Sequence, residues 1–149
     1  MILEKILGNI KDVKLEGCHI ETIYLNNEEM LKRIIKAESD HGNDYGIIVP
    51  DGMKLKDGDI VFNDGYNVVV VKFAKEDVLI IKPKDITEMG RIAHYIGNKH
   101  FPAQFEDGKM FIQYDRVIEE DLKIRHIDYS RENIGLKEAF RHVDFTHRH

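Results

Sequence analysis

The order of secondary-structure signals in the second half of the chain constrains the fold more than any other feature. A buried-strand run at residues 77–82 precedes apolar residues spaced three and four apart over residues 86–96, the stripe of an amphipathic helix. A hairpin over residues 103–114, a second helical stripe over residues 117–124 and a short strand at residues 127–129 follow. Strand, helix, strand, strand, helix, strand is the ferredoxin-like (βαββαβ) pattern, so we expect that fold here.

The first half of the chain is typical of short strands separated by turns. Residues 1–7 and 20–25 are β-branched or alternating runs, and Asn63-Asp64-Gly65 separates two apolar runs at residues 60–62 and 67–73. The second arrangement is a strong hairpin signature. We therefore expect a small, mostly antiparallel, β-rich domain at the amino terminus.

Residues 30–38 fit two interpretations. Their first apolar members fall at helical spacing, and Asn26 or Asn27 is suited to cap a helix there. Residues 33–38, however, lead into a turn and a strand, as one arm of a hairpin would. Periodicity alone leaves both interpretations open.

The change in pattern predicts a domain boundary near residues 74–77. We therefore expect an α+β protein in three parts: a β-rich domain at residues 1–74, a ferredoxin-like domain at residues 75–134, and a flexible tail at residues 135–149. The tail has an apolar patch at residues 136–140 and then no regular pattern.

Composition excludes several classes of partner and compartment. The 149 residues carry 27 acidic and 22 basic side chains, a net charge of −5 at pH 7, which argues against nucleic acid as a partner. No run approaches the roughly 20 apolar residues of a membrane helix, and the amino terminus lacks a signal peptide's apolar stretch and cleavage site. Cys18 is the single cysteine, so no intramolecular disulfide forms. We expect a cytoplasmic protein.

One of the eight histidines has a position that suggests a role. His100 follows Gly97-Asn98, which fits the left-handed end of the preceding helix, and Phe101-Pro102 stiffens the chain on its far side. A histidine in such a loop can point outward with little rotamer freedom, although an exposed loop histidine explains the spacing equally well. Four other histidines are interpreted as surface residues: His19, His41, His94 and His126.

A second group of histidines lies in the tail. His147-x-His149 places two imidazoles on one side of an extended segment, and His142 precedes them. A disordered tail or the remnant of a tag is the alternative. Imidazole suits late first-row divalent ions, and no thiolate cluster competes, so the pattern favours an exchangeable metal site.

Catalytic motifs are absent from the sequence. It has no H-E-x-x-H, C-x-x-C or G-x-S-x-G motif and no phosphate-binding Gly-rich loop. We therefore expect a protein that transports a metal ion rather than an enzyme that acts on a substrate.

The sequence resembles the urease accessory nickel metallochaperones, the UreE family, over nearly its whole length. The resemblance rests on a central signature with its flanks and on the tail. These segments are Ile96-Gly97-Asn98-Lys99-His100, Pro102-Ala103-Gln104-Phe105, Gln113-Tyr114-Asp115, Ile81-Lys82-Pro83, Glu88-Met89-Gly90, Asp57-Gly58-Asp59 and Phe140-Arg141-His142 to His147-Arg148-His149.

The resemblance implies a β-rich, partner-binding first domain and a ferredoxin-like, metal-binding second domain that forms a homodimer. It implies that His100 of both subunits binds one nickel ion at the interface, with His147, His149 and His142 as further ligands. The implied partners are the urease apoprotein and its accessory proteins, including the accessory GTPase. Some relatives carry extra histidines where this chain has Tyr114 and Arg116, which argues against high-capacity nickel storage here. The resemblance also favours a strand within residues 30–38.

The resemblance and the residues together predict a protein that delivers Ni²⁺ to urease. An all-histidine site cannot strongly reject Zn²⁺ or Cu²⁺, because intrinsic affinity favours copper over nickel. Two alternatives remain at this point: a protein-interaction adaptor whose histidines are incidental, and a small metal-dependent hydrolase.

Overall fold

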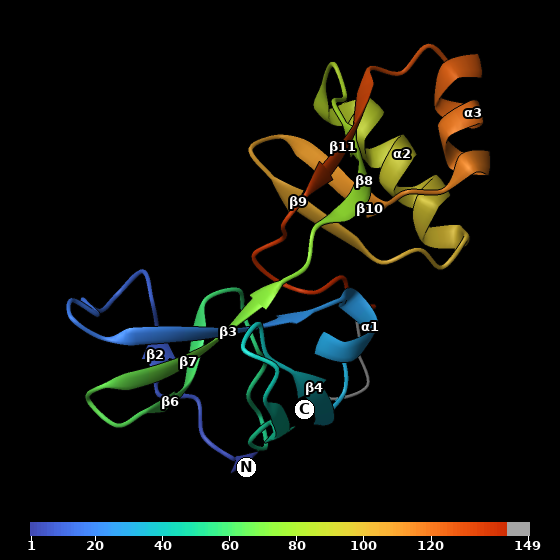
Figure 1. Cartoon of the computed structure of the whole chain (residues 1–149). Helices are drawn as coiled ribbons and strands as arrows, with labels where there is room; N and C mark the ends of the chain where they lie inside the picture. The colour runs from blue at the N-terminus through green and yellow to red at the C-terminus, as the bar shows by residue number, and fades with distance from the viewer. Residues whose placement is uncertain (143–149) are drawn as a thin grey trace. The chain divides into compact units, whose positions relative to one another are not determined.

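The computed structural model describes residues 1–142, and these form two compact units (Figure 1). The amino-terminal unit comprises Met1–Lys75 together with Gly135–Ala139. The carboxy-terminal unit comprises Glu76–Ile134 and, among the residues described, 140–142. The protein is thus a two-domain, β-rich α+β protein, as the sequence predicted.

The amino-terminal unit contains two sheets and one helical turn. Its elements are β1 (Ile2–Leu3), β2 (Gly8–Asn9), β3 (His19–Leu25), α1 (Asn27–Met30), β4 (Ile34–Glu38), β5 (Asp44–Ile48), β6 (Asp59–Asn63) and β7 (Asn67–Phe73). The strand orders are β1-β5-β4 and β2-β6-β7-β3. The β6–β7 hairpin was predicted. Three of the five strand pairings described in this unit are antiparallel, as the mostly antiparallel prediction requires, whereas β3 pairs with β7 and β1 with β5 in parallel.

The parallel pair β3–β7 forms the core of this unit. Val68 to Val71 are all at most 2% exposed, because both faces of β7 are covered. In β3, Ile23 and Leu25 are completely buried and alternate with the exposed Tyr24. A strand buried on both faces has a continuous apolar sequence, and this explains the run of four valines.

Both interpretations of the ambiguous segment proved partly correct. Asn26 caps α1 by accepting a hydrogen bond from the Glu29 amide at 2.9 Å, and the Glu29 carboxylate accepts one from the Asn26 amide at 3.1 Å. The helix ends after one turn at Met30. Strand β4 then begins at Ile34, so the segment is a capped helical turn followed by the strand that the family resemblance favoured.

The start of the expected tail packs on the amino-terminal unit. Leu136 and Ala139 are 7% and 5% exposed, and the Asp57 amide donates a 2.8 Å hydrogen bond to the Lys137 carbonyl. Phe140, the next residue, is completely buried. The flexibility expected of residues 135–149 stays a prediction, because residues 143–149 lie outside the described part of the chain, but Leu136, Ala139 and Phe140 are buried.

The carboxy-terminal unit is one four-stranded sheet with two helices. Its elements are β8 (Glu76–Ile81), α2 (Ile86–Asn98), β9 (Ala103–Glu106), β10 (Lys109–Gln113), α3 (Arg116–Ile124) and β11 (Tyr129–Ile134). The strand order is β11-β8-β10-β9, and every neighbouring pair is antiparallel. Both helices were predicted from their apolar stripes.

The core of this unit lies between the sheet and the helices, which lie on the same side of it (Figure 1). The helices contribute four side chains that are at most 4% exposed, and β8 and β10 contribute four more: Ile92, Ile96, Ile118, Leu122, Leu79, Ile81, Met110 and Ile112. Ile86 was expected in the helical stripe but is 87% exposed, because it is the first residue after the cap Asp85 and lies outside the buried face.

The last strand differs from its prediction in position. A strand was expected at residues 127–129, whereas β11 runs from Tyr129 to Ile134. Its sequence, YSRENI, has no apolar alternation because the strand is a half-exposed sheet edge that pairs only with β8. No helix within residues 1–142 is long and apolar enough to cross a membrane.

Candidate metal centre

His100 occupies the left-handed position of the turn that ends α2. The helix closes with Lys99 at φ −88°, and His100 follows at φ 61°. The His100 amide donates to the Gly97 carbonyl at 3.0 Å, and the Phe101 amide donates to the Ile96 carbonyl at 3.4 Å. These two bonds define a Schellman motif with His100 at the C′ position.

The prediction that Gly97-Asn98 would supply the left-handed residue was wrong. Both residues are helical, and the reversal falls two residues later, at His100. The physical reason is that Ile96 is the last core residue of α2, and the Schellman bonds bring Phe101 back to the same core. His100, the residue directly before Phe101, must then take positive φ.

A side chain at positive φ carries a steric cost of about 1–2 kcal/mol relative to glycine. Glycine is the usual residue at C′, and His100 occupies it with an exposed imidazole. Strain of this kind clusters at functional positions, so the conformation is consistent with a role for the ring.

The end of α3 has the same turn, so the backbone alone does not identify a ligand. His126 lies at φ 56°, its amide donates to the Lys123 carbonyl at 3.2 Å, and the Ile127 amide donates to the Leu122 carbonyl at 3.0 Å. His126 is exposed, as predicted. It provides a geometric control for His100.

Cation–π contacts order the last turn of α2 next to His100. The Lys99 ammonium lies 5.1 Å and the Arg125 guanidinium 4.5 Å from the centre of the Tyr95 ring. The Tyr95 hydroxyl also donates a hydrogen bond to the Asp121 carboxylate. Tyr95 therefore connects the two helices and gives the basic neighbour of His100 a defined aromatic partner.

The remaining predicted ligands are not part of a preformed cluster in the described structure. His142 is exposed, and His147 and His149 lie outside the described residues. Across residues 1–142, no group of three or more His, Cys, Asp or Glu side chains could hold a metal ion. The described part of one chain thus contains no complete coordination sphere, and His100 stays a single candidate ligand.

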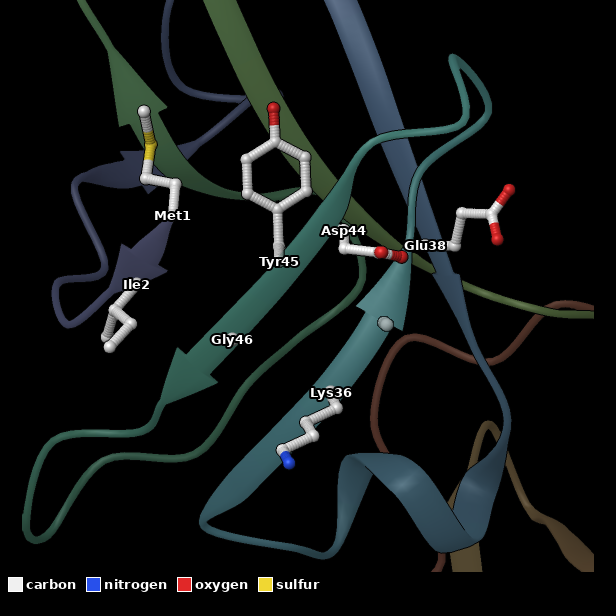
Figure 2. A pocket seen from close by; sticks show the side chains of 8 residues that line it. Met1, Ile2, Lys36, Glu38, Asp44, Tyr45 and Gly46 are labelled. Atoms are coloured by element: carbon white, nitrogen blue, oxygen red, sulfur yellow. The ribbon is translucent and has the colours of Figure 1, made fainter.

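A hollow of about 560 Å³ lies on the amino-terminal unit, and none of its lining residues is a histidine (Figure 2). It extends over β1, β4 and β5, and its lining residues are Met1, Ile2, Lys36, Ala37, Glu38, Asp44, Tyr45 and Gly46. A hydrolytic site needs a nucleophile or metal-bound water beside a base in a water-excluding pocket. This open, histidine-free hollow does not provide one.

Two histidines that the sequence assigned to the surface are exposed but also meet. The Nε2 atoms of His19 and His41 lie 2.8 Å apart, and the rings are perpendicular with centroids 4.7 Å apart. The two residues are separated by 21 others in the sequence, one at a strand start and one in a turn, so no spacing pattern connects them. The tertiary structure brings them together, because β3 of one sheet lies beside the turn between β4 and β5 of the other.

Fold and site together define a small two-domain α+β protein that presents candidate ligands at its surface rather than enclosing a substrate. Residues 3–74 match the family model described as UreE urease accessory protein, N-terminal domain, and residues 76–144 match the one for the C-terminal domain. The chain belongs to the UreE family of urease accessory proteins. The resemblance inferred from the sequence is therefore confirmed.

Individual relatives match over almost their full length. The urease accessory protein UreE of Geobacillus kaustophilus is 45% identical over 149 residues, covering 100% of this chain and 99% of the relative. The protein of the same name from Staphylococcus carnosus is 42% identical, with 99% of each chain covered. That of Ureaplasma urealyticum is 45% identical over 142 residues, 95% of each chain. The family consists of accessory proteins and not enzymes, which rules out the hydrolase alternative.

Proposed function

We propose that this protein is a cytoplasmic nickel metallochaperone that delivers Ni²⁺ to apo-urease during assembly of the urease metallocentre. The family assignment over both domains supports a role in urease assembly. The observation that carries the metal site is His100, an exposed imidazole anchored by two backbone hydrogen bonds at a strained position.

The ion is bound between two copies of the chain. One imidazole cannot satisfy a divalent ion, whereas a two-fold axis brings His100 of both subunits to the same point. His147, His149 and His142 then complete the coordination sphere from the tails. A sphere with an anchored pair and movable ligands binds the ion and also releases it, as delivery requires.

The two units divide the work. The carboxy-terminal unit, with strand order β11-β8-β10-β9, acts as a ferredoxin-like domain that dimerises and holds the metal. The β-rich unit binds the partners, which are the urease apoprotein and its accessory proteins, including the accessory GTPase. Zn²⁺ and Cu²⁺ compete for the same ligands, because an imidazole sphere follows the general affinity order that places copper above nickel.

Calorimetric titration with Ni²⁺ tests the assignment of His100. His100→Ala should abolish the high-affinity site without unfolding the protein, because the side chain is exposed and its removal deletes two ligands of one ion. His126→Ala, at the matched backbone position on α3, should bind nickel as the parent does. Equal nickel affinity of His100→Ala and the parent, with normal urease activation at limiting nickel, would contradict the proposal.

A protein-interaction adaptor is the second candidate, and one surface favours it. On the β1-β5-β4 sheet, Ile34 pairs with Ile48 across the strands, and the two are 68% and 36% exposed. Ile2, on the neighbouring strand, is 66% exposed. The adaptor hypothesis predicts that Ile34→Asp prevents urease activation even with excess nickel. A variant that has lost only nickel delivery should instead be compensated by added nickel.

A further inference from the structure

A pair of histidines in the amino-terminal unit forms a second potential ligand set. His19 is the first residue of β3, and His41 lies in the turn between β4 and β5. Their Nε2 atoms are 2.8 Å apart and both side chains are exposed. Nothing in the proposed nickel site uses either residue.

The orientation of His41 is fixed by a carboxylate. Asp40 Oδ1 lies 2.6 Å from His41 Nδ1, so the proton of a neutral His41 resides on Nδ1 and the lone pair of Nε2 points at His19. Histidines that ligate metals characteristically donate their other nitrogen to a carboxylate, which fixes the tautomer and increases the basicity of the ligand. The hydrogen bond between His41 Nδ1 and Asp40 is of this kind, and it is formed in the protein alone.

The carboxylate is itself held in place by β3. Asp40 Oδ1 accepts a 2.9 Å hydrogen bond from the Thr22 amide, and the Asp40 amide donates to the Thr22 carbonyl at 2.8 Å. Because Thr22 lies three residues after His19 on the same strand, the element that carries one histidine also positions the support of the other.

The turn that carries His41 is also ordered from within. The His41 amide donates to Ser39 Oγ at 3.2 Å, and Ser39 Oγ in turn donates to Glu21 Oε1 at 2.7 Å. The His19 amide donates to the Tyr66 carbonyl at 2.7 Å, which anchors the other side. Both imidazoles therefore project from fixed backbone.

The separation of the two nitrogens suits a common metal ion. For metal–nitrogen bonds of about 2.05 Å, two nitrogens are about 2.9 Å apart at a right angle and about 3.3 Å apart at the tetrahedral angle. The observed 2.8 Å is close to the right-angle value, so the nitrogens need to separate by at most about half an ångström. The two rings must also rotate, so that their Nε2 lone pairs converge on one point beside the line that joins the nitrogens. His19 must also place its proton on Nδ1, which frees the Nε2 lone pair.

We propose that His19 and His41 form an auxiliary site for a late first-row divalent cation in the amino-terminal unit, with Asp40 as the positioning residue for His41. Solvent supplies the remaining ligands. A two-imidazole site of this kind follows the order that places Cu²⁺ above Ni²⁺ and Zn²⁺, and its exposure makes it exchangeable. The His19–His41 site does not involve His100, so it can be tested separately from the proposed nickel delivery.

The test is a Cu²⁺ titration of full-length protein in which His100, His142, His147 and His149 are replaced by alanine. This background should bind one Cu²⁺ per chain. His19→Gln and His41→Gln, each added to the background, should lose that ion. His94→Gln, which removes an exposed helical histidine of the other unit, should keep it.

Asp40→Asn tests the positioning role. The asparagine oxygen can still accept from the Thr22 amide, but it is a weaker partner for the imidazole N–H, so Cu²⁺ affinity should fall at least about tenfold. Thermal midpoints without metal show whether each variant remains folded, and paramagnetic broadening of the His19 and His41 ring resonances locates the ion.

Unchanged affinity and stoichiometry in folded His19→Gln and His41→Gln variants would overturn the proposal. So would a background protein that binds no Cu²⁺ at micromolar concentration, or one in which broadening centres on His94 or His126. Loss of the ion in only the two histidine variants, with the rings of both residues broadened in the background, supports the site.

Discussion

Phe101 and Ile96 are joined twice: the Phe101 amide donates to the Ile96 carbonyl, and both side chains belong to the apolar core of the carboxy-terminal unit. The four residues between them must reverse the direction of the backbone to permit both contacts. His100 takes the left-handed conformation that the reversal requires. Its position is therefore determined by the packing of its neighbours and not by the histidine itself.

His100→Gly should stabilise the fold while it destroys the nickel site. Glycine removes the positive-φ cost of the histidine, about 1 kcal/mol, which corresponds to a rise of roughly 2–4 °C in the thermal midpoint for a chain of this size. Thermal unfolding without metal and nickel calorimetry on the same sample measure the two effects.

His126→Gly is the matched control, since it relieves the same strain at the end of α3. We expect a similar gain in stability with nickel binding unchanged. If both glycine variants lose nickel binding, the ligand assignment to His100 alone is wrong. A lower thermal midpoint for both would show that the imidazoles make stabilising contacts.

Removal of the residues after Phe140 should leave a folded protein that still binds nickel, with lower affinity or fewer ions. The truncation keeps Phe140, which is completely buried, and deletes residues 141–149, which include the candidate ligands His142, His147 and His149. Calorimetry beside the full chain provides the comparison. Complete loss of binding with the fold intact would make the tail, and not His100, the primary site.

Nickel affinity should fall as the solution is acidified, because only neutral imidazole coordinates a metal ion. Titrations at about pH 7.5 and pH 5.5 measure the change. Equal affinity at the two values would mean that carboxylates carry the coordination.

Glu21 should stabilise the amino-terminal unit in a pH-dependent way. Burial raises the pKa of this carboxyl, but hydrogen bonds from Tyr45, Ser39 and Asn43 outweigh it, and the pKa lies below the usual 4.5. A lowered pKa means that the stabilisation is present above about pH 4.5 and is lost as the pH falls through the folded-state value.

Glu21→Gln removes the charge from this network and should cost about 1–3 kcal/mol at neutral pH. Glu38→Gln, an exposed substitution on the neighbouring strand, should cost little. Urea unfolding at pH 7 and pH 3.5 would measure both. A difference between Glu21→Gln and the parent that is as large at the lower pH would exclude the charge as its source.

Sequence patterns predicted the carboxy-terminal unit well because the spacing of apolar residues in its helices and strands matches the faces that are buried. The spacing of Ile92 and Ile96 and the turn at Asp107-Gly108 are local signals, and both elements formed where expected. Strand β11 was misplaced because an edge strand that is half exposed needs no apolar alternation. The parallel pairing of β3 with β7 could not be predicted from local sequence, because the paired residues are 48 positions apart and no turn joins the two strands.

The candidate site was predictable in part. His100 could be selected because helix-ending and chain-stiffening residues flank it, but the residue that adopts positive φ was misassigned to Gly97-Asn98. The His19–His41 contact could not be predicted, because it depends on two sheets placing a strand start beside a distant turn. Residue type identified possible ligands, and tertiary structure decided which of them meet.

The return of Gly135–Ala139 to the amino-terminal unit has a consequence for the order of folding during synthesis. The amino-terminal unit lacks the buried Leu136 and Ala139, and the carboxy-terminal unit lacks the buried Phe140, until the chain has been translated past Ile134. The first unit to be translated is therefore completed only after nearly all of the second has been made. The β-rich unit becomes fully supported only when His100, the proposed nickel ligand, has already been made.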